Sequence, residues 1–198
     1  AYRKAIEIDP FYAYPWLCLG QLLADHLGRF KEAETAYRTS IEIDPERAFT
    51  LSLLGCLLAD HLGQNEEAET AYRKAIETDP NDPFLWICLG NFLKEHLGQY
   101  EEAETTYRKA IEIDPNYAYA WSCLGYLYAE RLGRLGEAEA VIRKAIELDP
   151  EDAEEIAEAE PEEQRVEDPL KKEFYTQDLP LNDSLMNVSH NRIRDALY

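Results

Sequence analysis

The sequence predicts an all-α fold, a solenoid built from stacked antiparallel helix pairs. Three observations predict it. Proline recurs every 35 residues, at Pro10, Pro45, Pro80, Pro115 and Pro150. Two series of glycines keep the same interval, one at Gly20, Gly55, Gly90 and Gly125, the other at Gly28, Gly63, Gly98 and Gly133. Between these markers the apolar residues recur at helical spacing.

This period divides the chain into repeated units as far as Pro150. The four full units are 11–45, 46–80, 81–115 and 116–150, and residues 1–10 correspond to the last third of an earlier unit. In the first unit, one amphipathic helix spans roughly 12 to 27, and Gly28 follows it where a left-handed helix cap favours glycine. A second helix spans roughly 30 to 43 and ends at Asp44, because the residue before Pro45 is pushed out of the helical region.

The repeated residues resemble the tetratricopeptide repeat, whose signature runs aromatic, Leu-Gly, aromatic or apolar, Ala, aromatic, Ala and Pro. In the first unit these positions hold Trp16, Leu19, Gly20, Leu23, Ala33, Tyr37, Ser40 and Pro45. Leu51 replaces the tryptophan in the second unit, and Ile142 replaces the second aromatic in the fourth. The family's usual period is 34 residues. The extra residue lies between Leu23 and Gly28, where we expect it to lengthen the first helix or alter the turn.

The resemblance covers residues 1–150 and implies a right-handed superhelix whose concave side is lined by the first helices. It also implies a non-enzymatic scaffold that binds an extended peptide or a partner helix in this groove. By the family's pattern the groove residues are Tyr14, Leu17, Gln21 and Asp25 in the first unit, Phe49, Ser52, Cys56 and Asp60 in the second, Phe84, Ile87, Asn91 and Glu95 in the third, and Tyr119, Ser122, Tyr126 and Glu130 in the fourth.

Two series within this set repeat in every unit. We call Tyr14, Phe49, Phe84 and Tyr119 the aromatic ladder, and Asp25, Asp60, Glu95 and Glu130 the carboxylate ladder. Together they favour a partner with apolar anchors and Lys or Arg side chains. The alternative is that the aromatics pack between neighbouring units and that the acids are only solvated.

Charge and missing motifs exclude other functions. The formal net charge of −20 repels phosphates, so we expect neither nucleic acid nor a membrane surface as a partner. No motif for catalysis or metal binding is present, so no cofactor is predicted. The in-phase His26, His61 and His96 lie about a helix-pair width apart, too far to share one ion. Four cysteines without a pairing motif, and no visible signal peptide, favour the cytoplasm.

The composition changes after Pro150. Residues 151–169 hold ten acids and one base, which predicts an acidic, degenerate cap or linker. Residues 170–198 carry scattered apolar anchors, and they predict either a disordered tail or a short helix that docks on an array. Two alternative functions stay open. One is self-assembly through this tail or through the apolar edge at residues 1–10, and the other is a docking or sensor arm of a larger enzyme.

Overall fold

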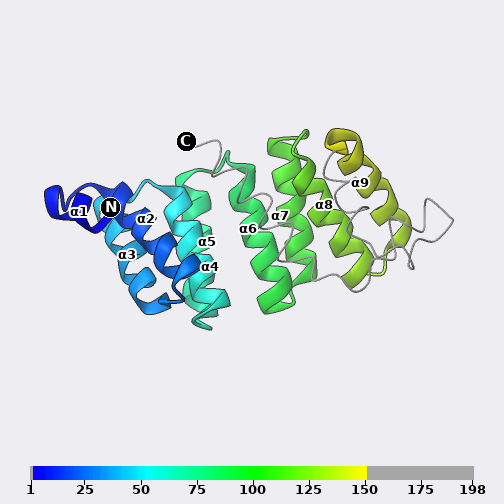
Figure 1. Ribbon diagram of the computed structural model, residues 1–198. Helices are drawn as coiled ribbons and strands as arrows, with labels where there is room; N and C mark the ends of the chain where they lie inside the picture. Colours follow the sequence, from blue (N-terminus) through cyan, green and yellow to red (C-terminus); the bar gives the residue numbers. More distant parts are fainter. Residues whose placement is uncertain (1, 151–198) are drawn as a thin grey trace, which may run out of the picture. The chain divides into compact units, whose positions relative to one another are not determined.

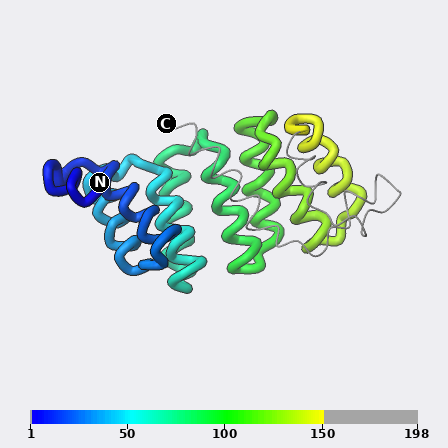
Figure 2. The backbone as a smooth tube through the Cα atoms, in the orientation of Figure 1, coloured from blue at the N-terminus to red at the C-terminus, as the bar shows by residue number. Residues whose placement is uncertain are grey.

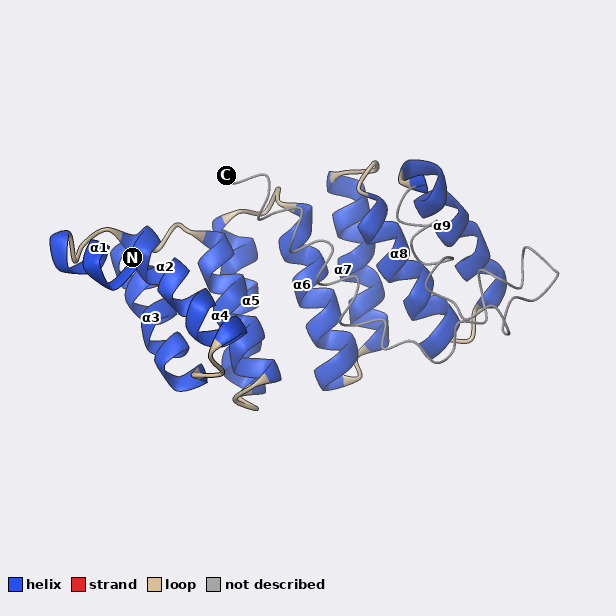
Figure 3. Ribbon diagram, viewed as in Figure 1, coloured by secondary structure: helices blue, strands red, loops and turns tan. Residues whose placement is uncertain are grey.

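The computed structural model describes residues 2–150, and the predicted all-α solenoid is confirmed there. This range holds nine α-helices, three single π-helical turns and no strand (Figures 1 and 3). The helices are α1 (Tyr2–Ile8), α2 (Ala13–Gln21), α3 (Phe30–Ile43), α4 (Ala48–Asp60), α5 (Asn65–Thr78), α6 (Pro83–Phe92), α7 (Tyr100–Ile113), α8 (Ala118–Tyr126) and α9 (Leu135–Leu148). The π turns continue α2, α6 and α8 at Leu22–His26, Leu93–Leu97 and Leu127–Arg131.

The helices pack as consecutive pairs, α2 with α3, α4 with α5, α6 with α7 and α8 with α9. Each pair contacts the next through α3 and α4, α5 and α6, or α7 and α8, and the trace in Figure 2 follows this order. The pairs lie inside the units proposed from the sequence, whose boundaries stay a prediction. The predictions for 151–169 and 170–198 fall outside the described residues. Within the described range, no helix combines the length and the apolar character needed to cross a membrane.

Close approach of the two helices in a pair depends on glycine. A Cβ atom placed on Gly90 in α6 would lie 2.5 Å from Cε1 of Tyr107 in α7 and 2.7 Å from Oγ1 of Thr106. Tyr107 is fully buried against this glycine, and Gly20 faces Tyr37 in the same way. In the first three pairs a tyrosine of the second helix thus fills the space that a glycine of the first helix leaves open, and in the fourth pair Ile142 takes this place beside Gly125.

The turn after each first helix accommodates the extra residue of the 35-residue period. Gly98 adopts a left-handed conformation with φ 64°, and the next N–H, of Gln99, donates to the carbonyl of Leu93 at 2.9 Å. The equivalent backbone N–H in the other three units donates to the equivalent carbonyl at 2.8 Å, from Arg29 to Leu23, from Gln64 to Leu58 and from Arg134 to Tyr128. It reaches back six residues, one more than in the Schellman motif. The extra residue thus alters the turn, which contains a π-helical turn in three of the four units.

Candidate functional site

The predicted groove residues all lie on the first helix of a pair or on the turn that continues it. Successive first helices contact each other directly, α4 with α6 and α6 with α8. The second helices are joined differently, by long side chains. Arg38 of α3 pairs with Glu67 of α5 at 2.7 Å, and Arg73 of α5 pairs with Glu102 of α7 at 2.7 Å. The first helices therefore form the more closely packed side of the stack.

The aromatic ladder is half-buried, and its two phenylalanines touch. The ring centroids of Phe49 and Phe84 are 6.3 Å apart with the planes tilted by 38°. At either end the ladder tyrosines lie against a tyrosine of the preceding turn, Tyr14 at 6.4 Å from Tyr12 and Tyr119 at 6.3 Å from Tyr117. The aromatics thus contact neighbouring rings and still keep part of their surface exposed.

A polar cluster lies beside the ladder between the third and fourth units. The Tyr107 hydroxyl donates to Oδ1 of Asn91 at 2.6 Å, and the side chain of Tyr119 also hydrogen-bonds with Asn91. Burial raises the pKa of Tyr119 well above its ordinary value, so this phenol stays neutral. Lys94 adds a largely buried ammonium, which pairs with the carboxylate of Glu95 at 2.9 Å. This part of the surface offers both donors and acceptors, and Asn91 already has partners within the chain.

The inner members of the carboxylate ladder are already paired. Asp60 accepts from the Cys56 thiol at 3.1 Å and lies 2.7 Å from Nε2 of His96 in the next unit. Burial, together with the nearby Asp60 carboxylate, raises the pKa of Cys56 well above its usual range, so the thiol keeps the proton that it donates. Glu95 lies 3.5 Å from Arg131, which occupies the place of His96 one unit later. Asp60 is thus engaged by two hydrogen-bond partners, and the negative charge of Glu95 is offset by Lys94 and Arg131.

The outer members of the ladder differ from the inner ones. Asp25 and Glu130 are exposed, and neither forms an ion pair with another residue of the described range 2–150. Asp25 has no histidine pair because His61 instead stacks on Phe30, with ring centroids 4.0 Å apart and planes inclined by 6°. Asp25 and Glu130, at the two ends of the ladder, therefore carry carboxylates that no ion pair of the described range engages.

Other groove residues predicted from the sequence are less accessible. Leu17, Ser52 and Ile87, which share one phase, are only 4%, 3% and 1% exposed. The Ser52 hydroxyl donates to the carbonyl of Phe49 in its own helix at 2.8 Å. Half-buried positions are found at Gln21, Cys56, Asn91, Ser122 and Tyr126. The accessible surface of the groove is thus made mainly by the two ladders and these half-buried side chains.

His96 and Arg131 also belong to this surface, although neither is among the groove residues expected from the family's pattern. Both residues recur in phase with His26 and His61, and this recurrence is visible in the sequence. Their pairing with a carboxylate of the preceding unit depends on how the units stack, which the period alone does not reveal.

Comparison with known families supports the repeat assignment. Models described as tetratricopeptide repeat match residues 1–35 and 71–105, 24–83, and 118–152, and one described as TPR repeat matches 96–130. These matches run together from residue 1 to residue 152. A comparison with curated proteins finds no significant match.

Several solved structures are similar. A crystal structure of MamA has 25% identity and a TM-score of 0.64, covering 78% of this chain and 88% of that one. YrrB, described as a TPR protein with an unusual peptide-binding site, has 26% identity and a TM-score of 0.59, covering 80% of each chain. A MamA fragment from Desulfovibrio magneticus RS-1 shares the fold at 20% identity and a TM-score of 0.62, covering 75% and 82%. The chain belongs to the tetratricopeptide repeat family, a family of protein-interaction scaffolds.

Proposed function

We propose that this chain binds an extended peptide, or a helix of a partner protein, along the surface formed by α2, α4, α6 and α8. The observation that carries the proposal is the contact between Phe49 and Phe84, two half-buried rings at the middle of that surface. Large aromatic side chains that are partly exposed and held by their neighbours are the usual anchors of an interface. The close packing of the first helices favours a concave surface on this side.

The chemistry of the partner follows from the two ladders. Apolar side chains of the partner pack on the Phe49–Phe84 pair, and Lys or Arg side chains lie toward Asp25 and Glu130, which have no ion-pair partner in the described range. Each exposed ion pair adds only about 0.2–1 kcal/mol, so the aromatics supply affinity and the acids supply orientation and a faster approach. The chain acts as a scaffold in this proposal, without a catalytic residue or a cofactor.

A pair of matched peptides tests the proposal. The basic peptide carries Leu and Phe anchors alternating with Lys, and the acidic peptide has Glu in place of each Lys. Fluorescence anisotropy should report tighter binding of the basic peptide, and the difference should shrink as salt is added, because exposed charges are screened. Equal or tighter binding of the acidic peptide would refute the proposed partner chemistry.

A second candidate function is self-assembly, favoured by one observation. Ile8, Phe11 and Tyr12 are 78%, 83% and 54% exposed and lie close together in sequence at the α1–α2 turn. The positions equivalent to Phe11 hold Glu46, Asn81 and Asn116 in the other units, so an aromatic here is unusual. If a second copy covers this edge, light scattering should show a molecular mass that falls on dilution, and Phe11→Glu should give the monomer mass. A constant monomer mass at all concentrations argues against self-assembly.

A further inference from the structure

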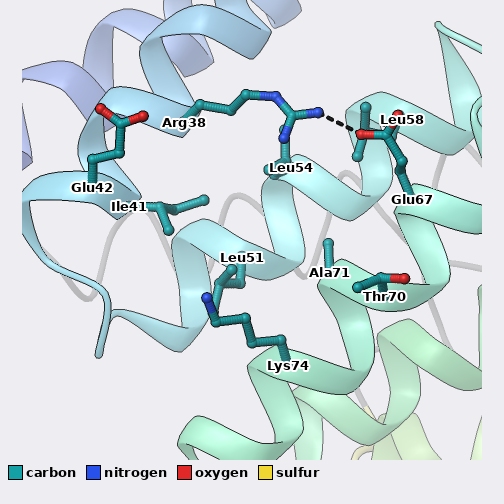
Figure 4. A pocket seen from close by; sticks show the side chains of 10 residues that line it. All are labelled: Arg38, Ile41, Glu42, Leu51, Leu54, Leu58, Glu67, Thr70, Ala71 and Lys74. Atoms are coloured by element: carbon teal, nitrogen blue, oxygen red, sulfur yellow. Dashed lines mark hydrogen bonds and ion pairs between the residues drawn. The ribbon is translucent and has the colours of Figure 1, made fainter.

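A hollow of about 320 Å³ lies on the opposite side of the stack from the first-helix surface, between α3 and α5 and over α4 (Figure 4). Its floor is a single face of α4, because Leu51, Leu54 and Leu58 follow one another at helical spacing. The Arg38–Glu67 pair, at 2.7 Å, spans one end of it. The volume is within the range of pockets that bind small ligands or single side chains.

Among the described first helices α2, α4, α6 and α8, only α4 lacks a tryptophan, and the hollow lies over α4. Trp16, Trp86 and Trp121 stand at the position equivalent to Leu51. In each case the indole Nε1 donates to the carbonyl of the proline six residues earlier, at 3.1, 3.0 and 2.9 Å. The second unit keeps the corresponding proline, Pro45, but Leu51 has no donor and is smaller than an indole. In three units a tryptophan therefore stands where the second unit has Leu51, a residue of the hollow's floor.

Two charged side chains line the hollow without an ion pair in the described part of the chain. Lys74 of α5 reaches across it toward Leu51, and Glu42 stands on the α3 side (Figure 4). The equivalent lysines of later units behave differently, since Lys109 pairs with Glu112 at 2.9 Å and Lys144 with Glu147 at 3.1 Å. The apolar floor therefore lies between an ammonium on one side and a carboxylate on the other.

We propose that this hollow is a second binding site, which takes a tryptophan side chain of a partner peptide flanked by one basic and one acidic residue. The indole lies over Leu51 and Leu54. The acidic neighbour pairs with Lys74, and the basic neighbour pairs with Glu42, which gives complementary charge on both walls. The site is separate from the groove of the proposed function, because it is built by the second helices and by the other face of α4.

The probe for this site is a fluorescein-labelled heptapeptide with Lys-Trp-Asp at its centre, and its binding is followed by anisotropy. Leu51→Trp fills the hollow with the residue that three other units carry, so the fold should survive, and the affinity should fall by at least about tenfold. Leu51→Met, which conserves the volume, should bind within a few-fold of the wild type. Lys74→Glu, an exposed substitution that leaves the core untouched, should also weaken binding of this peptide.

The outcomes separate this site from the groove. Binding that survives Phe84→Ala and is lost in Leu51→Trp supports the hollow as the site. Binding that is lost in Phe84→Ala and retained in both Leu51→Trp and Lys74→Glu places the peptide in the groove, which overturns the second site and leaves the proposed function standing. A peptide with Ala in place of Trp that binds equally well also overturns it. Circular dichroism of each variant verifies that the helices are intact.

Discussion

Replacing Tyr107 with Ala is expected to lower the free energy of unfolding by about 3–5 kcal/mol, the usual cost of deleting a large buried aromatic. The ring is fully buried against Gly90, and its hydroxyl donates to Asn91 at 2.6 Å. Because each helix pair contacts only its neighbours, a cavity in α6–α7 should also uncouple the pairs on either side. Urea denaturation followed by far-UV circular dichroism should therefore show an earlier and broader transition.

The matched control is Tyr107→Phe. It keeps the ring against Gly90 and removes only the hydroxyl that donates to Asn91, so it should cost about 1 kcal/mol. If the Ala and Phe variants unfold at the same urea concentration, packing of the ring does not hold the pair together, and this account of the interior is wrong.

Replacing Phe84 with Ala is expected to weaken binding of the basic peptide by about 2 kcal/mol or more, roughly thirtyfold. Phe84 belongs to the third of the four units, and its ring lies 6.3 Å from that of Phe49. Its removal therefore deletes one ring of the central pair and leaves the other without its neighbour. Fluorescence anisotropy gives the dissociation constants, and thermal unfolding followed by circular dichroism verifies that the array is still folded.

Two variants separate the contribution of the ring from that of charge. Phe84→Leu retains most of the apolar surface and should lose less affinity than Phe84→Ala. Asp25→Asn removes one exposed carboxylate, and it should change the affinity only a few-fold, by an amount that vanishes at high salt. If a folded Phe84→Ala variant binds the basic peptide as tightly as the wild type does, the aromatic ladder is not the binding surface.

Most of the fold could be predicted from the sequence because every unit repeats the same proline and glycine positions and the same helical spacing of apolar residues. Gly20 and Tyr37 recur together in phase, as Gly90 and Tyr107 do, and the structure brings each glycine against the tyrosine of its own pair. The place of the extra residue was also predictable, since the interval between Leu23 and Gly28 contains it. The conformation of this turn could not be predicted, because several backbone paths satisfy the same spacing. It is a π-helical turn closed by a hydrogen bond that reaches back six residues.

The candidate site was less predictable because it depends on contacts between units. Asp25 and Asp60 are equivalent in the sequence, yet only Asp60 pairs with a histidine of the next unit. For Asp25 the histidine of the next unit is His61, but its ring stacks on Phe30 instead. The residue equivalent to Phe30 one unit later is Asn65, which has no ring on which His96 could stack. The replacement of tryptophan by Leu51 was visible in the sequence. The hollow beside Leu51 could not be predicted, because the spacing of α3 and α5 determines whether neighbouring side chains close over Leu51.

The unequal joints between successive units have a mechanical consequence. One edge of the array is held by direct contact between α4, α6 and α8, whereas the other is tied by solvent-facing bridges such as Arg73–Glu102. Exposed bridges are weak and weaken further as salt is added, whereas contacts between packed helices resist deformation. We therefore expect the array to bend more easily along the side of the second helices than along the side of α4, α6 and α8, with a bending stiffness that falls as the salt concentration rises.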